Sequence, residues 1–202
     1  MLVSKLLLLL SSYNPTPIVK KPEKGSLLIA EPSIIGDLSF NRAVVLLADH
    51  NYLGSVGFIL NKKLDYYLKD LIEGTESEFP IYNGGPVEQD NLYFIHKSPD
   101  LIPNSIEISQ GIFWGGDFST VLKLINNKKI SCEDIKFFLG YSGWEEKQLN
   151  DELASQAWVV SKNTYKNQLI SKCCEEYWKE KMLEMGGKYS IWSNAPENPS
   201  YN

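Results

Sequence analysis

The segment Phe137-Phe138-Leu139-Gly140-Tyr141-Ser142-Gly143-Trp144 sets the expected architecture of the second half of this chain. Its apolar start extends back to residue 135, which predicts a buried strand over residues 135–139. The two glycines predict a tight turn that carries a hydroxyl, and the polar residues that follow predict a helix over residues 145–154. A strand, a glycine turn and a helix in this order form the geometry on which many enzymes mount a nucleophile.

Upstream, the Val- and Leu-rich residues 43–48 predict a central strand that is buried on both faces. The turn Asn51-Tyr52-Leu53-Gly54 joins this strand to another over residues 55–60, so the two form a hairpin. Further strands are predicted over residues 25–30, 92–96, 105–108, 112–114 and 157–160. Helical spacing of apolar residues predicts helices over residues 64–73, 117–126 and 165–185. Strands occur both in hairpins and between helices, which indicates an α+β fold with a mixed or antiparallel sheet.

Length and composition fit a single globular domain, with 202 residues of which 43% are hydrophobic and 22% charged. The net charge of −5, without a block of five like charges, speaks against direct nucleic-acid binding, which needs clustered Lys and Arg. The three cysteines, two of them adjacent, make a poor disulfide framework. They indicate a reducing, cytoplasmic compartment.

The first 24 residues form a segment of their own. Lys5 is followed by leucines at positions 6–10, and residues 14–24 are rich in Pro and Lys. The leucine run is too short for a signal peptide or a membrane span. We therefore expect a short helix and an extended connector, docked on the body or on a second subunit. The protein is expected to be soluble and not to associate with membranes. An oligomer is possible if the segment docks on a second subunit.

Ser142 is the nucleophile that the glycine turn suggests. A nucleophile elbow needs Gly-x-Ser-x-Gly, whereas Gly143 follows Ser142 directly, so the spacing is one residue short. Both histidines of the chain precede Ser142, which does not match the residue order of α/β-hydrolases. We interpret the two glycines as a structural corner between strand and helix. A small-molecule hydrolase or transferase that uses Ser142 or His50 with a carboxylate such as Asp90 is the alternative.

Sites for phosphate or metal find little support in the sequence. Asn83-Gly84-Gly85-Pro86 could cradle a phosphate through backbone amides, but it lacks the Lys and Ser/Thr of a P-loop and is interpreted as a structural turn. Asp49 with His50, and Asp90 with His96, do not have the spacing of a recognised metal site. We therefore predict neither a metal nor a cofactor.

Arg42, the single arginine of the chain, precedes the buried strand over residues 43–48. Its planar guanidinium could hold a carboxylate or phosphate of a ligand through two parallel hydrogen bonds. The structural alternative is an internal salt bridge to Asp37, Asp90 or Glu31, because buried arginines usually pair.

Several blocks of the chain occur together, and in order, in one known family. They are Gly25-Ser26-Leu27-Leu28-Ile29-Ala30-Glu31-Pro32, Phe40-Asn41-Arg42-Ala43-Val44-Val45-Leu46-Leu47 through His50, Gly54, Gly57-Phe58-Ile59-Leu60-Asn61, Gly84-Gly85-Pro86-Val87, Phe138-Leu139-Gly140-Tyr141-Ser142-Gly143-Trp144 with Gln148-Leu149, Ala157-Trp158, Tyr177-Trp178, Gly186-Gly187, Pro196 and Asn198-Pro199-Ser200-Tyr201-Asn202.

In these blocks the chain resembles the AlgH/YqgE family. The resemblance covers residues 25–202 and leaves residues 1–24 outside. It implies a single α+β domain with a small β-barrel-like core flanked by helices, in a cytosolic bacterial protein without an established activity. The family name implies a role in regulating gene expression. Two departures, Leu38 in place of a usual proline and Lys147 in place of a frequent glycine, alter loops near the candidate site.

Taken together, the sequence predicts a non-catalytic binding or regulatory module. Family-matching polar and glycine residues fall in loops at strand ends, where binding sites tend to lie. The predicted cleft consists of Arg42, Asn61, Gly84, Gly85, Tyr141 and Gln148. Its expected partner is a small anionic ligand or a protein. An assembly scaffold that uses an aromatic patch is the third hypothesis.

Overall fold

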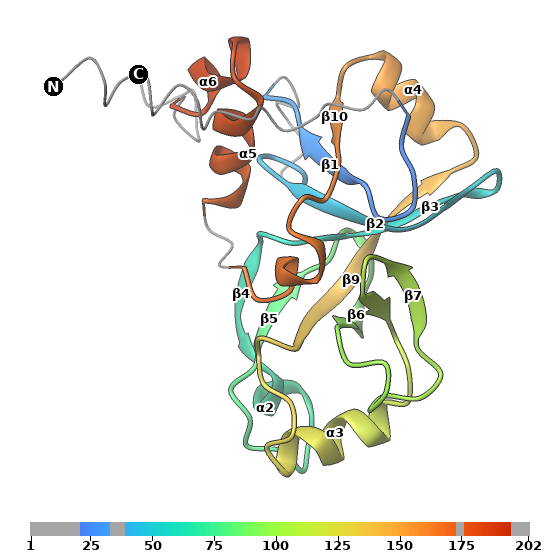
Figure 1. Ribbon diagram of the computed structural model, residues 1–202, viewed down its shortest axis with the longest axis vertical. Coiled ribbons are helices and arrows are strands. Elements are labelled where there is room, and N and C mark those ends of the chain that lie inside the picture. Colours follow the sequence, from blue (N-terminus) through green and yellow to red (C-terminus); the bar gives the residue numbers. More distant parts are fainter. Residues whose placement is uncertain (1–20, 33–38, 173–175, 195–202) are drawn as a thin grey trace, which may run out of the picture.

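The computed structural model describes residues 21–32, 39–172 and 176–194. Its strands are β1 (Leu27–Ala30), β2 (Val44–Asn51), β3 (Gly54–Ile59), β4 (Lys63–Tyr67), β5 (Pro80–Asn83), β6 (Val87–His96), β7 (Ile106–Ser109), β8 (Ile112–Trp114), β9 (Ile135–Glu145) and β10 (Trp158–Ser161). Its helices are α2 (Leu68–Leu71), α3 (Phe118–Asn126), α4 (Gln148–Ala154), α5 (Tyr177–Met185), α6 (Lys188–Trp192) and the 3-10 helix η1 (Lys166–Leu169). Helices α4, α5 and α6 lie at one end of the molecule and α2 and α3 at the other (Figure 1).

The strands form one path in the order β10-β1-β2-β3-β9-β6-β8-β7, and β4 and β5 attach beside it. Neighbouring strands are antiparallel except for β5, which runs parallel to β9. The predicted α+β fold with a mixed sheet in a single domain is thus confirmed. Within the described residues the sheet stays open, so the barrel-like core that the resemblance implies is a curved sheet rather than a closed barrel.

Strand β9 is longer than predicted, and the expected glycine turn at its end does not form. The strand continues through residues 140–145 and pairs with β6 up to Tyr141 and with β3 from Ser142 onwards. Gly140 has a φ of 69° at this transition, so the glycine bends the strand from one half of the sheet into the other. The strand-to-helix corner is therefore wrong, and α4 begins only at Gln148.

Two hydrophobic clusters enclose β1 and β2, one on each face of the sheet. Leu27, Ile29, Val44 and Leu46 pack with the buried side chains of α5. Their neighbours along the same strands pack on the opposite face with Trp144, Leu149 and Trp158. Because successive side chains of a strand point to opposite faces, a strand that is covered on both sides needs an unbroken apolar run. The central strand predicted over residues 43–48 is confirmed.

The third cluster fills the other half of the molecule, between α3 and the first half of β9. Val121 and Ile125 of α3 are buried there, and Asp117 caps the helix by accepting a hydrogen bond from the backbone N–H of Thr120 at 2.9 Å. The predicted helix over residues 117–126 and its cap are confirmed.

The helix predicted over residues 64–73 is wrong for its first half. Residues Lys63–Tyr67 form strand β4, which pairs with β5, and only Leu68–Leu71 are helical. The apolar spacing fits a helix, but pairing with the exposed edge of β5 satisfies the backbone of these residues in an extended form.

The long helix predicted over residues 165–185 is also interrupted. Its described parts are η1 and α5, and residues 173–175 between them lie outside the described residues. Its apolar residues are buried as expected: Ile170, Tyr177, Trp178 and Met182 all lie in the first cluster.

The expected N-terminal helix falls on residues 1–20, which lie outside the described residues. The domain boundary after residue 24 stays a prediction. Among the helices that the structure does describe, none has the length and apolar character that a membrane crossing requires.

Candidate functional site

A groove of about 580 Å³ lies on the exposed face of the sheet where β2, β3, β9 and β6 run side by side. We call it the sheet-face groove. Its lining residues are Asp49, Asn51, Leu53, Gly54, Ser55, Val56, Val87, Tyr141, Gly143, Trp144, Glu145 and Gln148. The β2–β3 hairpin, which projects to the right in Figure 1, forms one wall.

The floor of the groove follows from strand register. Val56 of β3 lies between Asp49 of β2 and Gly143 of β9, so these three residues form one row across the sheet. In the next row on the same face of the sheet, Gly54 lies between Asn51 and Glu145. The glycine in each row carries no side chain, and the sheet surface is therefore hollow at these points.

Tyr141 forms a side of the groove. It pairs across the sheet with Val87, and its ring packs edge-on against Tyr93 at a centroid distance of 5.6 Å. A Cβ atom at Gly143 would lie 3.2 Å from Cε2 of Tyr141, so the ring lies beside the floor. The tyrosine thus has a fixed position, as a recognition residue requires.

Gln148 closes one end of the groove at the start of α4. Its Oε1 accepts a hydrogen bond from the backbone N–H of Glu145 at 2.9 Å. Its Nε2 donates to Oε1 of Glu152 at 2.9 Å. The side chain therefore ties the end of β9 to helix α4. Asp49 and Glu145 supply carboxylates, and within the described lining no lysine or arginine offsets them.

A smaller hollow of about 360 Å³ adjoins the groove on the other side of the hairpin. It contains His50, whose Nδ1 lies 2.7 Å from the hydroxyl of Ser55. Ser55 is buried and lines both hollows. Lys147 and Glu146, which pair with each other at 3.3 Å, complete its rim.

Of the six predicted cleft residues, Tyr141 and Gln148 line the sheet-face groove. Arg42 and Asn61 lie together elsewhere. The side-chain amide of Asn61 donates to the carbonyl of Arg42 at 2.8 Å and accepts from the backbone N–H of Val44 at 2.8 Å. The Arg42 guanidinium lies 5.0 Å from the ring centroid of Trp178, at cation–π distance.

The salt bridges proposed for Arg42 stay a prediction. Glu31 pairs with Lys188 at 3.2 Å. Asp37 lies outside the described residues, and Asp90 is exposed on β6. Whether Arg42 binds an anionic ligand stays a prediction.

Gly84 and Gly85 follow strand β5 and lie close to the backbone of residues 140–142 of β9. The N–H of Gly84 donates to the carbonyl of Leu139 at 2.8 Å, and the N–H of Gly85 donates to the side chain of Asn83 at 2.9 Å. Both amides are therefore engaged within the protein. This arrangement agrees with a structural turn rather than a phosphate cradle.

Ser142 is fully buried on strand β9, and its hydroxyl donates a hydrogen bond to the carbonyl of Gly84 at 3.0 Å. In this position the hydroxyl joins the two crossing backbones. A nucleophile must be open to its substrate, and the buried Ser142 is not.

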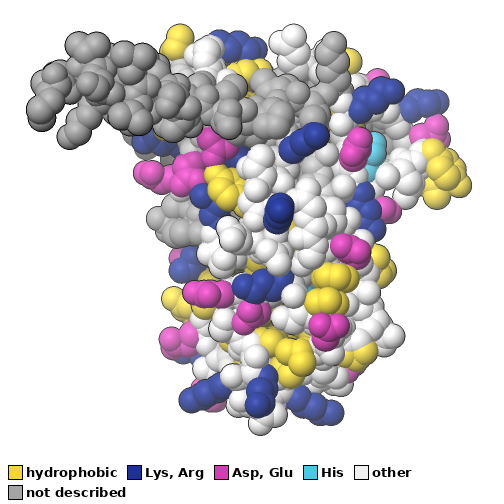
Figure 2. Space-filling model, in the orientation of Figure 1, with side chains coloured by type: hydrophobic (Ala, Val, Ile, Leu, Met, Phe, Trp, Pro, Cys, Tyr) yellow, Lys and Arg dark blue, Asp and Glu magenta, His cyan; other side chains and the backbone are white. Residues whose placement is uncertain are grey.

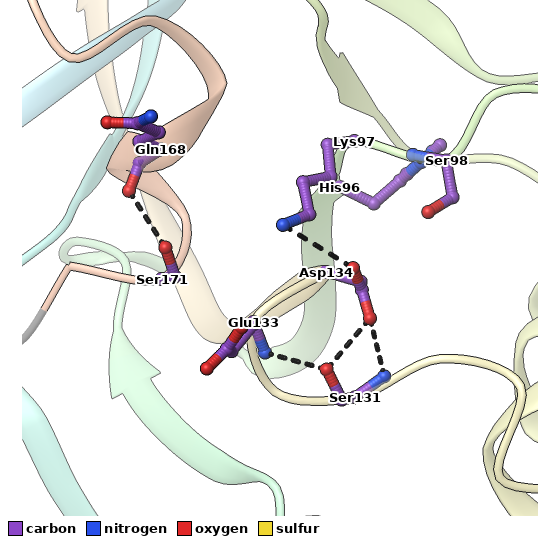
Figure 3. Close-up of polar contacts among 8 residues, drawn as sticks. All are labelled: His96, Lys97, Ser98, Ser131, Glu133, Asp134, Gln168 and Ser171. Carbon is purple, nitrogen blue, oxygen red and sulfur yellow. Dashed lines mark hydrogen bonds and ion pairs between the residues drawn. The ribbon is translucent and has the colours of Figure 1, made fainter.

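His96 ends strand β6 and is also fully buried. The backbone N–H of Ser98 donates to its Nδ1 at 3.1 Å, and its Nε2 lies 3.1 Å from the carbonyl of Gly115. These partners fix a neutral ring that carries its proton on Nε2. Figure 3 shows the polar contacts beside it, among them the ion pair between Lys97 and Asp134 at 3.4 Å. Within the described residues no group of three or more His, Cys, Asp or Glu side chains is placed to hold a metal ion.

The buried His96 should make the protein less stable in acid. Burial lowers the pKa of His96 below its ordinary value of 6.5. Between that lowered pKa and 6.5, the unfolded chain binds the proton and the folded chain does not. The contribution of the neutral His96 to the free energy of unfolding is therefore fully present above about pH 6.5. Below that pH, down to the lowered pKa, the free energy of unfolding falls by up to about 1.4 kcal/mol per pH unit. Urea unfolding at pH 4.5–7.5 measures this slope.

His96→Gln keeps a donor for Gly115 but cannot titrate, so its stability should change less over the same pH range. Equal slopes for wild type and His96→Gln would contradict the assignment.

Glu152 is a residue that the sequence interpretation missed. Its Oε2 accepts the indole N–H of Trp144 at 2.9 Å and that of Trp158 at 2.7 Å. The two indole rings and the ring of Phe40 pack together, with Phe40 edge-on to Trp158 at 5.2 Å. One carboxylate of α4 thus satisfies two buried donors and also holds Gln148.

The groove floor was missed for a different reason. Gly54 and Asp49 belong to one hairpin and Gly143 to a distant strand, and only the register places them in adjacent rows. In the structure, half-buried and buried residues alternate along residues 139–144, as they do in a strand. The residue types alone do not show this alternation.

Comparison with known proteins gives consistent matches. A family model described as AlgH-like matches residues 27–190. A UPF0301 protein of Bacteroides thetaiotaomicron is 40% identical over 185 residues, covering 90% of this chain and 92% of that protein. A UPF0301 protein of Chlorobium phaeobacteroides is 36% identical over 184 residues, covering 91% and 97%.

Solved structures agree in fold. The solution structure of the AlgH protein from Pseudomonas aeruginosa has a TM-score of 0.68 and 25% identity, and covers 88% of this chain and 98% of that one. A crystal structure of a protein from Corynebacterium diphtheriae has a TM-score of 0.67 with 18% identity, and covers 87% and 94%. The latter similarity concerns the fold alone.

Proposed function

The chain belongs to the AlgH-like family, and from that premise we propose that it is a non-catalytic binding module with a regulatory role in the cytoplasm. The sheet-face groove is its recognition site. The observation that carries this proposal is the hollow between β2, β3, β9 and β6, with Tyr141 and Gln148 at its edge.

The shape and chemistry of the groove support binding. Its volume of about 580 Å³ lies within the range of small-molecule sites, which run from about 300 to about 1,000 Å³. Val56, Val87 and Tyr141 provide apolar surface, and the side chains of Asn51 and Gln148 provide polar groups. All but Gln148 belong to paired strands or the hairpin between them, so the site is supported by a rigid scaffold.

The candidate nucleophiles and bases support a role without catalysis. Ser142 and His96 are fully buried and hydrogen-bonded within the protein. The His50–Ser55 pair has a contact that could serve an enzyme, but Ser55 is only 6% exposed. Nucleophilic catalysis needs a hydroxyl that a substrate can reach.

The experiment is to fill the groove floor. Gly143→Val adds a side chain that suits a strand, and its Cβ atom would lie 3.2 Å from Cε2 of Tyr141, so that the ring must give way by a few tenths of an ångström. A thermal-shift screen of the wild type against nucleotides, dicarboxylates, amino acids and diamines identifies stabilising compounds. Their affinity should fall by roughly tenfold or more in Gly143→Val, since the new side chain occupies the ligand's space.

Asp65→Val is the control, because it places the same side chain on the exposed strand β4 of the opposite half. Its ligand affinity should equal that of the wild type. Unchanged affinity in Gly143→Val would place the ligand elsewhere. Labelling of the wild type by a fluorophosphonate, lost in Ser55→Ala, would overturn the non-catalytic role in favour of a hydrolase.

A further inference from the structure

We infer that the sheet-face groove binds a ligand that carries a positively charged ammonium or guanidinium group on an apolar stem. This inference rests on the proposed function and names the ligand class of the same site. It is carried by the positions of two carboxylates, an aromatic ring and an apolar floor within one hollow.

The two carboxylates stand on either side of strand β3. Asp49 is on β2 and Glu145 is on β9, and β3 pairs with both strands. Adjacent strands lie about 4.8 Å apart, so the backbones that carry these carboxylates are separated by roughly 10 Å. Val56 and Gly54 form the floor between them. A cation in the groove would therefore meet negative charge from two directions.

No cationic side chain in the described lining balances this charge, and the amide of Asn51 donates one hydrogen bond to Oδ2 of Asp49 at 2.9 Å. The twelve lining residues include Asp49 and Glu145 but no lysine, arginine or histidine. His50 and Lys147 border the adjacent smaller hollow, which Glu145 also lines. A concave site lined by one sign of charge concentrates counter-ions of the opposite sign. The groove thus favours a cation, whereas the anionic ligand expected from the sequence depends on Arg42, which lies outside this lining.

The remaining walls suit the stem of such a ligand. Val56 and Val87 offer aliphatic surface, and Tyr141 offers an aromatic ring of the kind that attracts an ammonium or guanidinium group. Leu53, which is 68% exposed at the hairpin tip, borders the entrance. Figure 2 shows hydrophobic side chains gathered at this projecting tip. A bare inorganic cation would use none of this apolar surface.

Three six-carbon probes of equal length test the charge preference. They are 1,6-diaminohexane, 1,6-hexanediol and adipate, with two positive, no and two negative charges. In a titration of the ¹⁵N-labelled full chain, only the diamine should shift the backbone amides of Gly54, Gly143 and Gln148. Asp49→Asn combined with Glu145→Gln should weaken its binding by roughly tenfold, because each ion pair contributes modestly.

The control variant is Asp65→Asn combined with Glu73→Gln, which removes two exposed carboxylates from the opposite half of the molecule. It should bind the diamine as the wild type does. Equal weakening in both double variants would show that the diamine follows net charge alone, and would overturn the inference.

The other outcomes separate the inference from the proposed function. Shifts at the groove with the diol or adipate, but not with the diamine, would overturn the cationic ligand and leave the groove as a binding site. If no probe, and no compound of the thermal-shift screen, bound at the groove, both proposals would fail.

A free amine and a side chain of a protein partner share this chemistry. Nα-acetyl-lysine N-methylamide and its norleucine counterpart distinguish them. A lysine side chain from a partner is indicated if the lysine amide binds more tightly than the diamine and the norleucine amide does not bind. A free polyamine is indicated if the diamine binds more tightly.

Discussion

Gly84→Ala is expected to lower the free energy of unfolding by more than about 4 kcal/mol at 25 °C. A Cβ atom at this position would lie 2.1 Å from the carbonyl oxygen of Gly140. That atom belongs to the backbone of β9, so no side chain can turn aside to make room.

The backbone around Gly84 cannot move aside either. The carbonyl of Gly84 accepts hydrogen bonds from the N–H of Ile59 and the hydroxyl of Ser142, both at 3.0 Å. Gly140 is itself confined, because a Cβ atom there would lie 2.7 Å from the carbonyl oxygens of Gly85 and Val87. Any shift that relieved the overlap would break hydrogen bonds between the two halves of the sheet. A small domain has a free energy of unfolding of about 5–15 kcal/mol in total, so this loss removes a large part of it.

Urea unfolding followed by circular dichroism measures the effect. Gly143→Ala is the matched control, because it adds the same methyl group at a glycine of β9, the strand that Gly84 approaches. Its Cβ would lie 3.2 Å from a side-chain atom of Tyr141 instead of against backbone. The control should change the free energy of unfolding by less than about 1 kcal/mol. A Gly84→Ala protein as stable as this control would contradict the close backbone approach.

Glu152→Ala should lower the free energy of unfolding by about 4 kcal/mol. The substitution leaves the indole N–H groups of Trp144 and Trp158 without their acceptor, and these residues are only 5% and 4% exposed. Each buried donor that loses its partner costs about 1–3 kcal/mol. The loss of the bond from Gln148 adds a smaller, exposed contribution.

Glu152→Gln separates the hydrogen bonds from the packing. Its amide oxygen can still accept from the indoles, so we expect it to lose about half as much stability as Glu152→Ala. Glu146→Ala is the control, since Glu146 is exposed and pairs only with the exposed Lys147 among its described contacts. Its effect should stay within about 0.5 kcal/mol. Near-ultraviolet circular dichroism reports whether the tryptophans keep their fixed packing. Equal free energies of unfolding for Glu152→Ala and Glu146→Ala would refute the role of Glu152.

The sequence predicted some residues of the candidate site, but it did not predict which of them lie together. Tyr141 and Gln148 were predicted and do line one groove. Arg42 and Asn61 were predicted for the same cleft, yet the Asn61 side chain bridges backbone groups at the start of β2. A polar residue at a strand end looks the same in sequence whether it serves a ligand or satisfies the backbone of its own chain.

The sequence by itself determined the elements whose signals are local. The apolar run of β2, the turn into β3 and the Asp117 cap of α3 each arise from neighbouring residues. Covered strands need continuous apolar side chains and helix starts need acceptors, so these signals survive in any tertiary context.

Only the tertiary structure decided what the glycines of residues 137–144 do. In sequence, Gly140 and Gly143 read as a turn before a helix. In the fold, β6 pairs with β9 up to Tyr141 and β3 pairs with it from Ser142 onwards, so the strand continues and bends at Gly140. Gly143 then becomes the floor of a groove because Val56 and Asp49, about ninety residues earlier in the chain, align with it across the sheet. Strand register depends on pairing between distant segments, and no local pattern contains it.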